Sequence, residues 1–130
     1  MQPIRAVCSQ DMGLCVNPQG SIIQAEGCVT MGMGYALSEE LILDKGYLAT
    51  DTLAKIGIPT IVHSPSLEVV LLEDPEPSGP FGAKGIAEAA TVPSAPAVIN
   101  AIHDAIKVRI YRLPATPDRV AGAIVNKSYC

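Results

Sequence analysis

The sequence predicts an α+β fold in which short strands pack beside two main helices and a short C-terminal helix. The stretch "SLEVVLLED" places Leu67, Val69 and Leu71 on one face of a strand, because alternate side chains of a strand point the same way. Two longer runs, over residues 21–46 and 94–106, have the composition and apolar spacing of helices. At 130 residues the chain is expected to form one domain, residues 1–130, with a core of its own.

The first helix is the longest predicted element. Residues 4–16 lead to it as extended chain and close with an Asn-Pro turn signal. Ser21 and Gln24 have the spacing of a capping box, S-x-x-Q, so the helix is expected to begin at Ser21, and Gly46 is expected to end it. Apolar residues lie on several faces of this helix, which predicts that it is buried.

Loops and shorter elements follow. Residues 47–66 are expected to be mostly loop, "SLEVVLLED" a strand and "DPEPSGPFGAKG" a long ordered loop. After the helix over residues 94–106, "VRIYRL" alternates like a strand. The stretch "ATPDRVAGAI" predicts a last helix that Thr116 caps and that has Pro117 in its first turn.

The composition predicts that other protein covers part of the surface. Hydrophobic residues make up 48% of the chain and charged residues only 17%, against about 25% in typical soluble domains. A free domain with so few charges would expose a large apolar patch. We therefore expect the chain to be part of a larger polypeptide or complex and to self-associate when isolated.

Several classes of partner are disfavoured. The net charge is −4 and aromatic residues are few, which argues against nucleic-acid binding. No segment approaches the ~20 apolar residues of a membrane span, and a cytoplasmic location is expected. The four cysteines form no C-x-x-C pair, so no metal site is predicted, and they are interpreted as buried reduced thiols.

The stretch "GPFGAKGIAEAA", residues 79–90, is the candidate site. Its glycines can bring backbone N–H groups close to a ligand, and Glu88 follows them among apolar residues, a setting that suits a general base. From these residues alone, an exposed acid at a helix entry is the preferred interpretation of Glu88. Lys84 either offsets a phosphate charge or solvates the loop. A Walker motif is rejected because Gly85 follows Lys84 where that motif needs Ser or Thr.

Two stretches carry a resemblance to a known family. "NPQGSIIQAEGCVTMGMGYALSEEL" and "GPFGAKGIAEAATVPSAPAVINAIHDAIKVRIYRLPATPDRV" closely resemble the C-terminal end of the molybdenum-binding subunit of the xanthine dehydrogenase and aldehyde oxidase family. The resemblance implies one lobe of a larger molybdenum-binding module. It also implies a molybdenum–pterin cofactor, either molybdopterin or its cytosine dinucleotide form, shared with an upstream domain, and iron–sulfur and FAD partners that receive electrons.

The resemblance assigns roles to individual residues. Glu88 stands where the family has its catalytic base. Gln24 matches a glutamine beside the pterin, although a capping role for Gln24 remains an equal alternative, and Gly85 and Ala87 fall in the cofactor-binding loop. The family usually has Gly before the glutamate and often Pro after it, whereas this chain has Ala87 and Ala89.

Three functions are therefore considered. The first is part of a molybdenum hydroxylase, inactive alone, that helps to hydroxylate an N-heterocycle or aldehyde with water as the oxygen source. The second is a non-catalytic assembly or interaction domain that keeps the fold. The third is an unrelated small-molecule binding domain that uses residues 79–85 as an anion nest.

Overall fold

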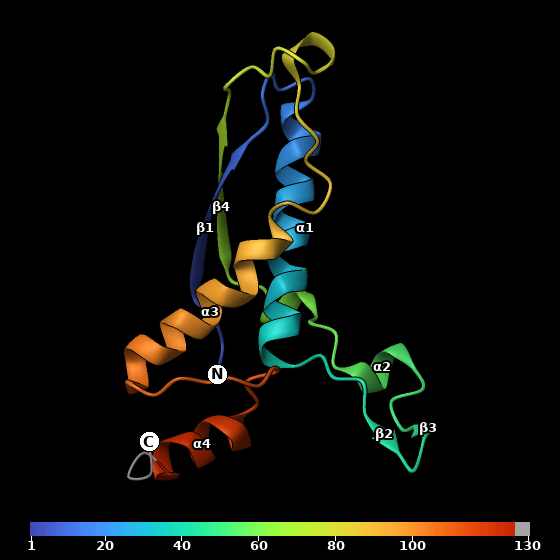
Figure 1. Cartoon of the computed structure of the whole chain (residues 1–130), viewed down its shortest axis with the longest axis vertical. Coiled ribbons are helices and arrows are strands. Elements are labelled where there is room, and N and C mark those ends of the chain that lie inside the picture. The colour runs from blue at the N-terminus through green and yellow to red at the C-terminus, as the bar shows by residue number, and fades with distance from the viewer. Residues whose placement is uncertain (127–130) are drawn as a thin grey trace.

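A computed structural model describes residues 1–126 of the chain. Helix α1 (Pro18–Leu37) forms its long axis, and a two-stranded parallel sheet of β1 (Arg5–Asp11) and β4 (Ser66–Leu72) lies along one side of it (Figure 1). Helix α3 (Thr91–Ile106) packs against α1, and α4 (Pro117–Val125) lies below α3 in the same view. The predicted α+β class is confirmed.

Both predicted ends of the first helix are wrong. The side chain of Asn17, not Ser21, caps α1: its Oδ1 accepts a hydrogen bond of 3.0 Å from the Gly20 N–H, and Pro18 occupies the first helical turn. The helix ends at Leu37. Gly46 instead belongs to the tight turn of a small hairpin, β2 (Leu43–Asp44) and β3 (Tyr47–Leu48), where its φ of 87° suits glycine.

The sheet fixes where the candidate loop begins. Strands β1 and β4 run parallel in register from Arg5 opposite Ser66 to Asp11 opposite Leu72, so both strands finish at the same end. The strand predicted in "SLEVVLLED" is confirmed as β4, and the extended start of the chain forms β1 only as far as Asp11. The loop after β4 therefore starts beside the turn after β1.

The core lies where α1 meets the sheet and α3. One cluster of buried side chains surrounds α1, and it comprises Ala25, Cys28, Val29, Met33 and Ala90. The two helices approach closely because residue 32 is glycine: a Cβ there would lie 2.4 Å from the Ser94 Cβ. A second cluster, Ile102, Ala115 and Val120, joins α3 to α4.

The remaining segments differ in how well they were predicted. The region expected to be mostly loop contains β3, the single-turn α2 (Leu53–Ile56) and a 3₁₀ turn at Ile61–His63. The predicted strand "VRIYRL" is wrong, because residues 108–113 form no strand. The cap of α4 is confirmed, since the Thr116 side chain accepts from the Arg119 N–H.

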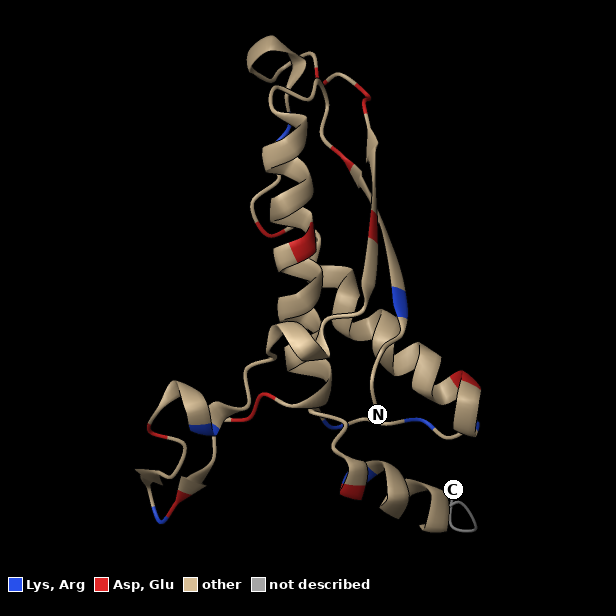
Figure 2. Cartoon of the chain, turned by 180° about the vertical axis from the view of Figure 1, so that it is seen from behind, with Lys and Arg blue, Asp and Glu red and all other residues tan. Residues whose placement is uncertain are grey.

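Charged residues are sparse along the chain, as the coloured ribbon of Figure 2 shows. Helix α1 carries one charged side chain, Glu26, along its whole length. Large apolar side chains are exposed on several elements, among them Ile4, Val7, Ile23, Leu43 and Phe81. No helix within residues 1–126 has both the length and the hydropathy of a membrane-spanning segment.

Candidate functional site

The loop that carries the candidate residues is attached to the turn after β1. The Lys84 N–H donates to the Met12 carbonyl at 2.8 Å, and the Leu14 N–H donates to the Gly82 carbonyl at 2.8 Å. This contact requires glycine at position 13, whose φ is 62°, because a Cβ there would lie 2.2 Å from the Gly82 oxygen. The predicted loop is thus ordered by backbone hydrogen bonds.

Lys84 is held by carboxylates. Its Nζ lies 2.6 Å from Asp11 Oδ2 and 3.8 Å from Asp74 Oδ2. The hydrogen bond between the Lys84 and Asp11 side chains lowers the pKa of Asp11 and raises the pKa of Lys84, because it favours the charged form of each. The ammonium group therefore anchors the loop to the end of β1, a role that neither interpretation of Lys84 had included.

Glu88 lies between this anchor and α3. Its backbone carbonyl accepts from the Thr91 N–H at 3.0 Å, at the start of the helix. Its side chain is exposed, and its carboxylate makes no hydrogen bond or ion pair within residues 1–126. This chain by itself does not provide an apolar enclosure, and the side chain instead agrees with the exposed helix-entry acid considered from the sequence.

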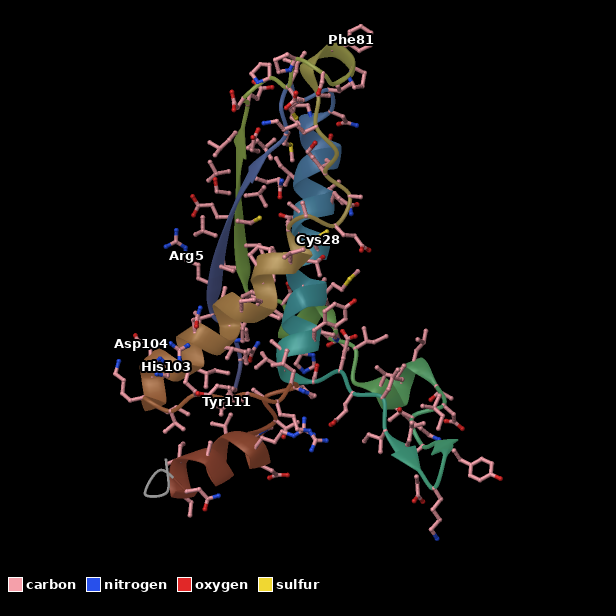
Figure 3. All side chains as sticks on the ribbon, in the orientation of Figure 1. Arg5, Cys28, Phe81, His103, Asp104 and Tyr111 are labelled. Atoms are coloured by element: carbon pink, nitrogen blue, oxygen red, sulfur yellow. The ribbon has the colours of Figure 1, made fainter. Side chains whose placement is uncertain are left out.

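Gln24 and Cys28 both contact the residue before Glu88. The Gln24 Nε2 and the Cys28 thiol each donate to the carbonyl oxygen of Ala87, the thiol at a distance of 3.1 Å. Figure 3 shows Cys28 on α1, and Gln24 is one turn earlier on the same helix. The capping role considered for Gln24 is wrong, because Asn17 caps the helix and Gln24 lies in its second turn.

The segment also offers free hydrogen-bonding groups. The N–H groups of Gly85 and Ala87 have no acceptor within the described part of the chain, and the Gln24 Oε1 has no donor there. An added Cβ at Gly85 would meet no atom within 4 Å, so the backbone is open to a neighbour. Unpaired N–H donors beside an amide oxygen fit a pterin, whose ring edges and phosphate need both kinds of partner.

Some of these contacts were not predicted from the sequence. Cys28 follows Gln24 by four residues, and this spacing places two helical side chains on one face. The sequence could therefore have predicted that these two residues contact the same neighbour. The ion pair of Asp11 with Lys84 joins residues 73 positions apart. Nothing local in the sequence indicates that pair.

Comparison with known families and proteins gives consistent results. Residues 1–65 match the family described as molybdopterin cofactor-binding domain. The chain is 40% identical to an aldehyde oxidoreductase of Megalodesulfovibrio gigas, in a match that covers 88% of this chain and 12% of the relative. It is 37% identical to a xanthine dehydrogenase molybdenum-binding subunit of Escherichia coli O157:H7, in a match that covers 85% of this chain and 15% of the relative.

A solved structure has the same fold. The crystal structure of quinoline 2-oxidoreductase from Pseudomonas putida 86 superposes with a TM-score of 0.85 at 33% sequence identity. The superposition covers 92% of this chain and 16% of that one. The chain therefore spans less than a sixth of the length of these relatives, and the resemblance seen in its sequence is confirmed.

Proposed function

The chain belongs to the molybdopterin cofactor-binding domain family, and from that premise we propose that it supplies the catalytic base of a molybdenum hydroxylase. The reaction oxidises an N-heterocycle or an aldehyde at carbon, and water provides the oxygen. When bound, the molybdenum–pterin cofactor supplies a Lewis-acidic centre that takes up two electrons. The observation that carries the proposal is the free carboxylate of Glu88 on a segment that α1 and β1 hold in place.

Glu88 accepts the proton that is released when the water-derived oxygen attacks the substrate carbon. A general base must be within hydrogen-bonding reach of that proton, so its carboxylate must be free of other partners. The carboxylate of Glu88 meets this condition, whereas those of Asp11 and Asp74 contact Lys84. The remainder of the module would close over Glu88 and exclude water.

Three residues form this chain's share of the cofactor wall. Gln24 offers an amide oxygen, and Gly85 and Ala87 offer backbone N–H groups that have no partner within residues 1–126. These groups can hold the pterin by hydrogen bonds without any charged side chain. The proposal leaves open whether the pterin is molybdopterin or its cytosine dinucleotide form.

The partners follow from the uncovered surface. We propose that residues 1–130 are a single domain, the C-terminal part of a molybdopterin-binding domain, and that the upstream domain covers the apolar groove between β1 and α3. Ile4, Ala6, Val98, Ala101 and Ala105 line this groove. Iron–sulfur and FAD subunits or domains then receive the electrons.

The free thiols of Cys8, Cys15 and Cys28 fit a reducing cytoplasm, and Cys130 lies outside the described residues.

Substitution of Glu88 tests the proposal. Glu88→Gln keeps the size of the side chain but cannot accept a proton, so in the assembled enzyme kcat should fall at least about a hundredfold, while molybdenum and pterin content stay at the wild-type level. Glu68→Gln removes a carboxylate from the exposed face of β4 and should leave kcat unchanged.

The same experiment separates the alternatives. Full cofactor content with kcat within a few-fold of wild type in Glu88→Gln would contradict the catalytic role. Absence of molybdenum and pterin from the wild-type assembly would instead favour the non-catalytic assembly domain.

A further inference from the structure

We propose that Gln24 and Cys28 together are positioning residues for Glu88, through a shared hydrogen bond acceptor, the carbonyl oxygen of Ala87. This inference rests on the proposed role of Glu88 as the base. The two donors come from one face of α1, and Ala87 directly precedes Glu88 in the chain. We call this arrangement the Ala87 clamp.

The clamp uses both lone pairs of one carbonyl. The Gln24 Nε2 and the Cys28 Sγ both donate to the Ala87 oxygen, and the Gln24 Nε2 also lies 3.5 Å from the Cys28 Sγ. A carbonyl oxygen can accept two hydrogen bonds, so the acceptor is saturated. The orientation of this carbonyl fixes the plane of the peptide that joins Ala87 to Glu88, because the peptide bond is planar.

Cys28 is held more firmly than the segment that it contacts. Cys28 is 2% exposed and belongs to the core cluster around α1. By contrast, the two contacts at the Ala87 carbonyl are the only hydrogen bonds that residues 85–87 make within the described chain. The nearest other backbone hydrogen bonds are those of the Lys84 N–H and the Glu88 carbonyl. The rigid helix therefore determines where this short segment, and the base that follows it, lies.

Loss of the clamp should affect catalysis more than substrate binding. A displacement of about 1 Å at a reacting group can cost up to about a hundredfold in rate. Cys28 and Gln24 reach Glu88 only through the backbone, so their loss should lower kcat and leave KM nearly unchanged. The Gln24 Oε1 has no partner in the described chain, so the same amide can also face the cofactor.

The kinetic test uses substituted forms of the assembled enzyme. Cys28→Ala removes one donor and Gln24→Leu removes the other; each should lower kcat about tenfold per molybdenum, with KM within about twofold of wild type. Cys28→Ser restores a donor and should recover most of kcat. Cys15→Ala and Gln19→Leu remove the same groups outside the clamp and serve as matched controls.

An infrared measurement tests the clamp without activity. The S–H stretching band of Cys28, obtained as the difference between wild type and Cys28→Ala, should lie at the lower frequency of a hydrogen-bonded thiol. A free-thiol frequency, or wild-type kcat in both Cys28→Ala and Gln24→Leu, would overturn the clamp. If Cys28→Ala fails to fold, Cys28→Val, which fills the space of the thiol but has no donor, decides the kinetic test, because Cys28 has no proposed contact with the cofactor.

The clamp and the proposed function can fail separately. A hydrogen-bonded Cys28 thiol, together with full activity in Glu88→Gln, would refute the role of Glu88 and keep the contact. Loss of activity in Glu88→Gln, together with a free Cys28 thiol, would refute the clamp and keep the base.

Discussion

The two halves of helix α1 have different neighbours. Its amino-terminal half exposes Gln24 and contacts the segment that carries Glu88, whereas its carboxyl-terminal half packs against α3 and the chain before α4. In Figure 1 the loop after β4 descends along the first half of α1, and α3 crosses the second half. One helix thus connects the proposed site to the scaffold, which explains how a loop residue can be held accurately.

The second half of α1 is defined by close contacts of small residues and backbone. Ala36 is fully buried, and its carbonyl accepts from the Ala115 N–H at 2.6 Å. Gly32 lets α3 approach, because the side chain of Ser94 occupies the space that a Cβ would need. Close packing against other parts of the chain therefore distinguishes the second half of α1 from the first, and this packing can be tested first.

Gly32→Ala should have the largest effect on stability. Its Cβ would lie 2.4 Å from the Ser94 Cβ and 3.0 Å from the Thr91 oxygen, so α1 and α3 must separate. Overpacking of this kind costs about 1–3 kcal/mol of the free energy of unfolding. Urea unfolding of the chain, followed by circular dichroism of the helices, measures the loss.

Gly27→Ala on the same helix is the matched control. An added Cβ at Gly27 meets no atom within 4 Å, and Ala is a better helix former than Gly. This variant should be as stable as wild type or more stable by up to about 1 kcal/mol. Equal midpoints for the two variants would show that the second half of α1 is not closely packed.

The sequence predicted the fold class better than the ends of its elements. The predicted start of α1 at Ser21 was wrong because an S-x-x-Q pattern can also occur inside a helix. The Asn-Pro pair before it was interpreted as a turn, although Asn at the cap and Pro in the first turn also begin helices. Its predicted end at Gly46 missed a tertiary effect: the Glu40 N–H donates to the Ile56 carbonyl, so the chain has already left the helix.

The site was predicted in part, and the missing part depends on distant contacts. The "GPFGAKGIAEAA" loop and Gln24 were recognised because their residue types and order are local features. The contact of Gln24 with Ala87 joins residues 63 positions apart, and only the packing of the loop on α1 creates it. The exposure of Glu88, by contrast, agrees with the exposed helix-entry acid that its residues alone indicated.

The ion pair of Asp11 with Lys84 gives a test of the loop that lies along the first half of α1. Asp11→Asn removes the 2.6 Å contact and should loosen the loop next to Lys84. Trypsin cleavage after Lys84 should then become several-fold faster, since cleavage needs local opening. Asp118→Asn, in the first turn of α4, is the control. Unchanged cleavage in Asp11→Asn would show that the backbone hydrogen bonds alone hold the loop.

The smallest expected effect concerns the chain just after the second half of α1, where Glu40 contacts Arg119 of α4. Glu40 Oε1 lies 2.6 Å from the Arg119 Nη2, and this hydrogen bond lowers the pKa of the Glu40 carboxyl below its ordinary value. A lowered folded-state pKa means that the pair stabilises the fold above the unfolded pKa and that this contribution is lost as the pH falls through the folded pKa.

Glu40→Gln should therefore melt at most a few degrees below wild type at pH 7, and the gap should close below about pH 4. Thermal unfolding at a series of pH values measures the gap, and Glu68→Gln, which breaks an exposed pair with Arg5, is the matched control and should show a smaller one. A gap that stays constant down to the lowest pH would mean that Glu40 stabilises the end of α1 by packing and not by its charge.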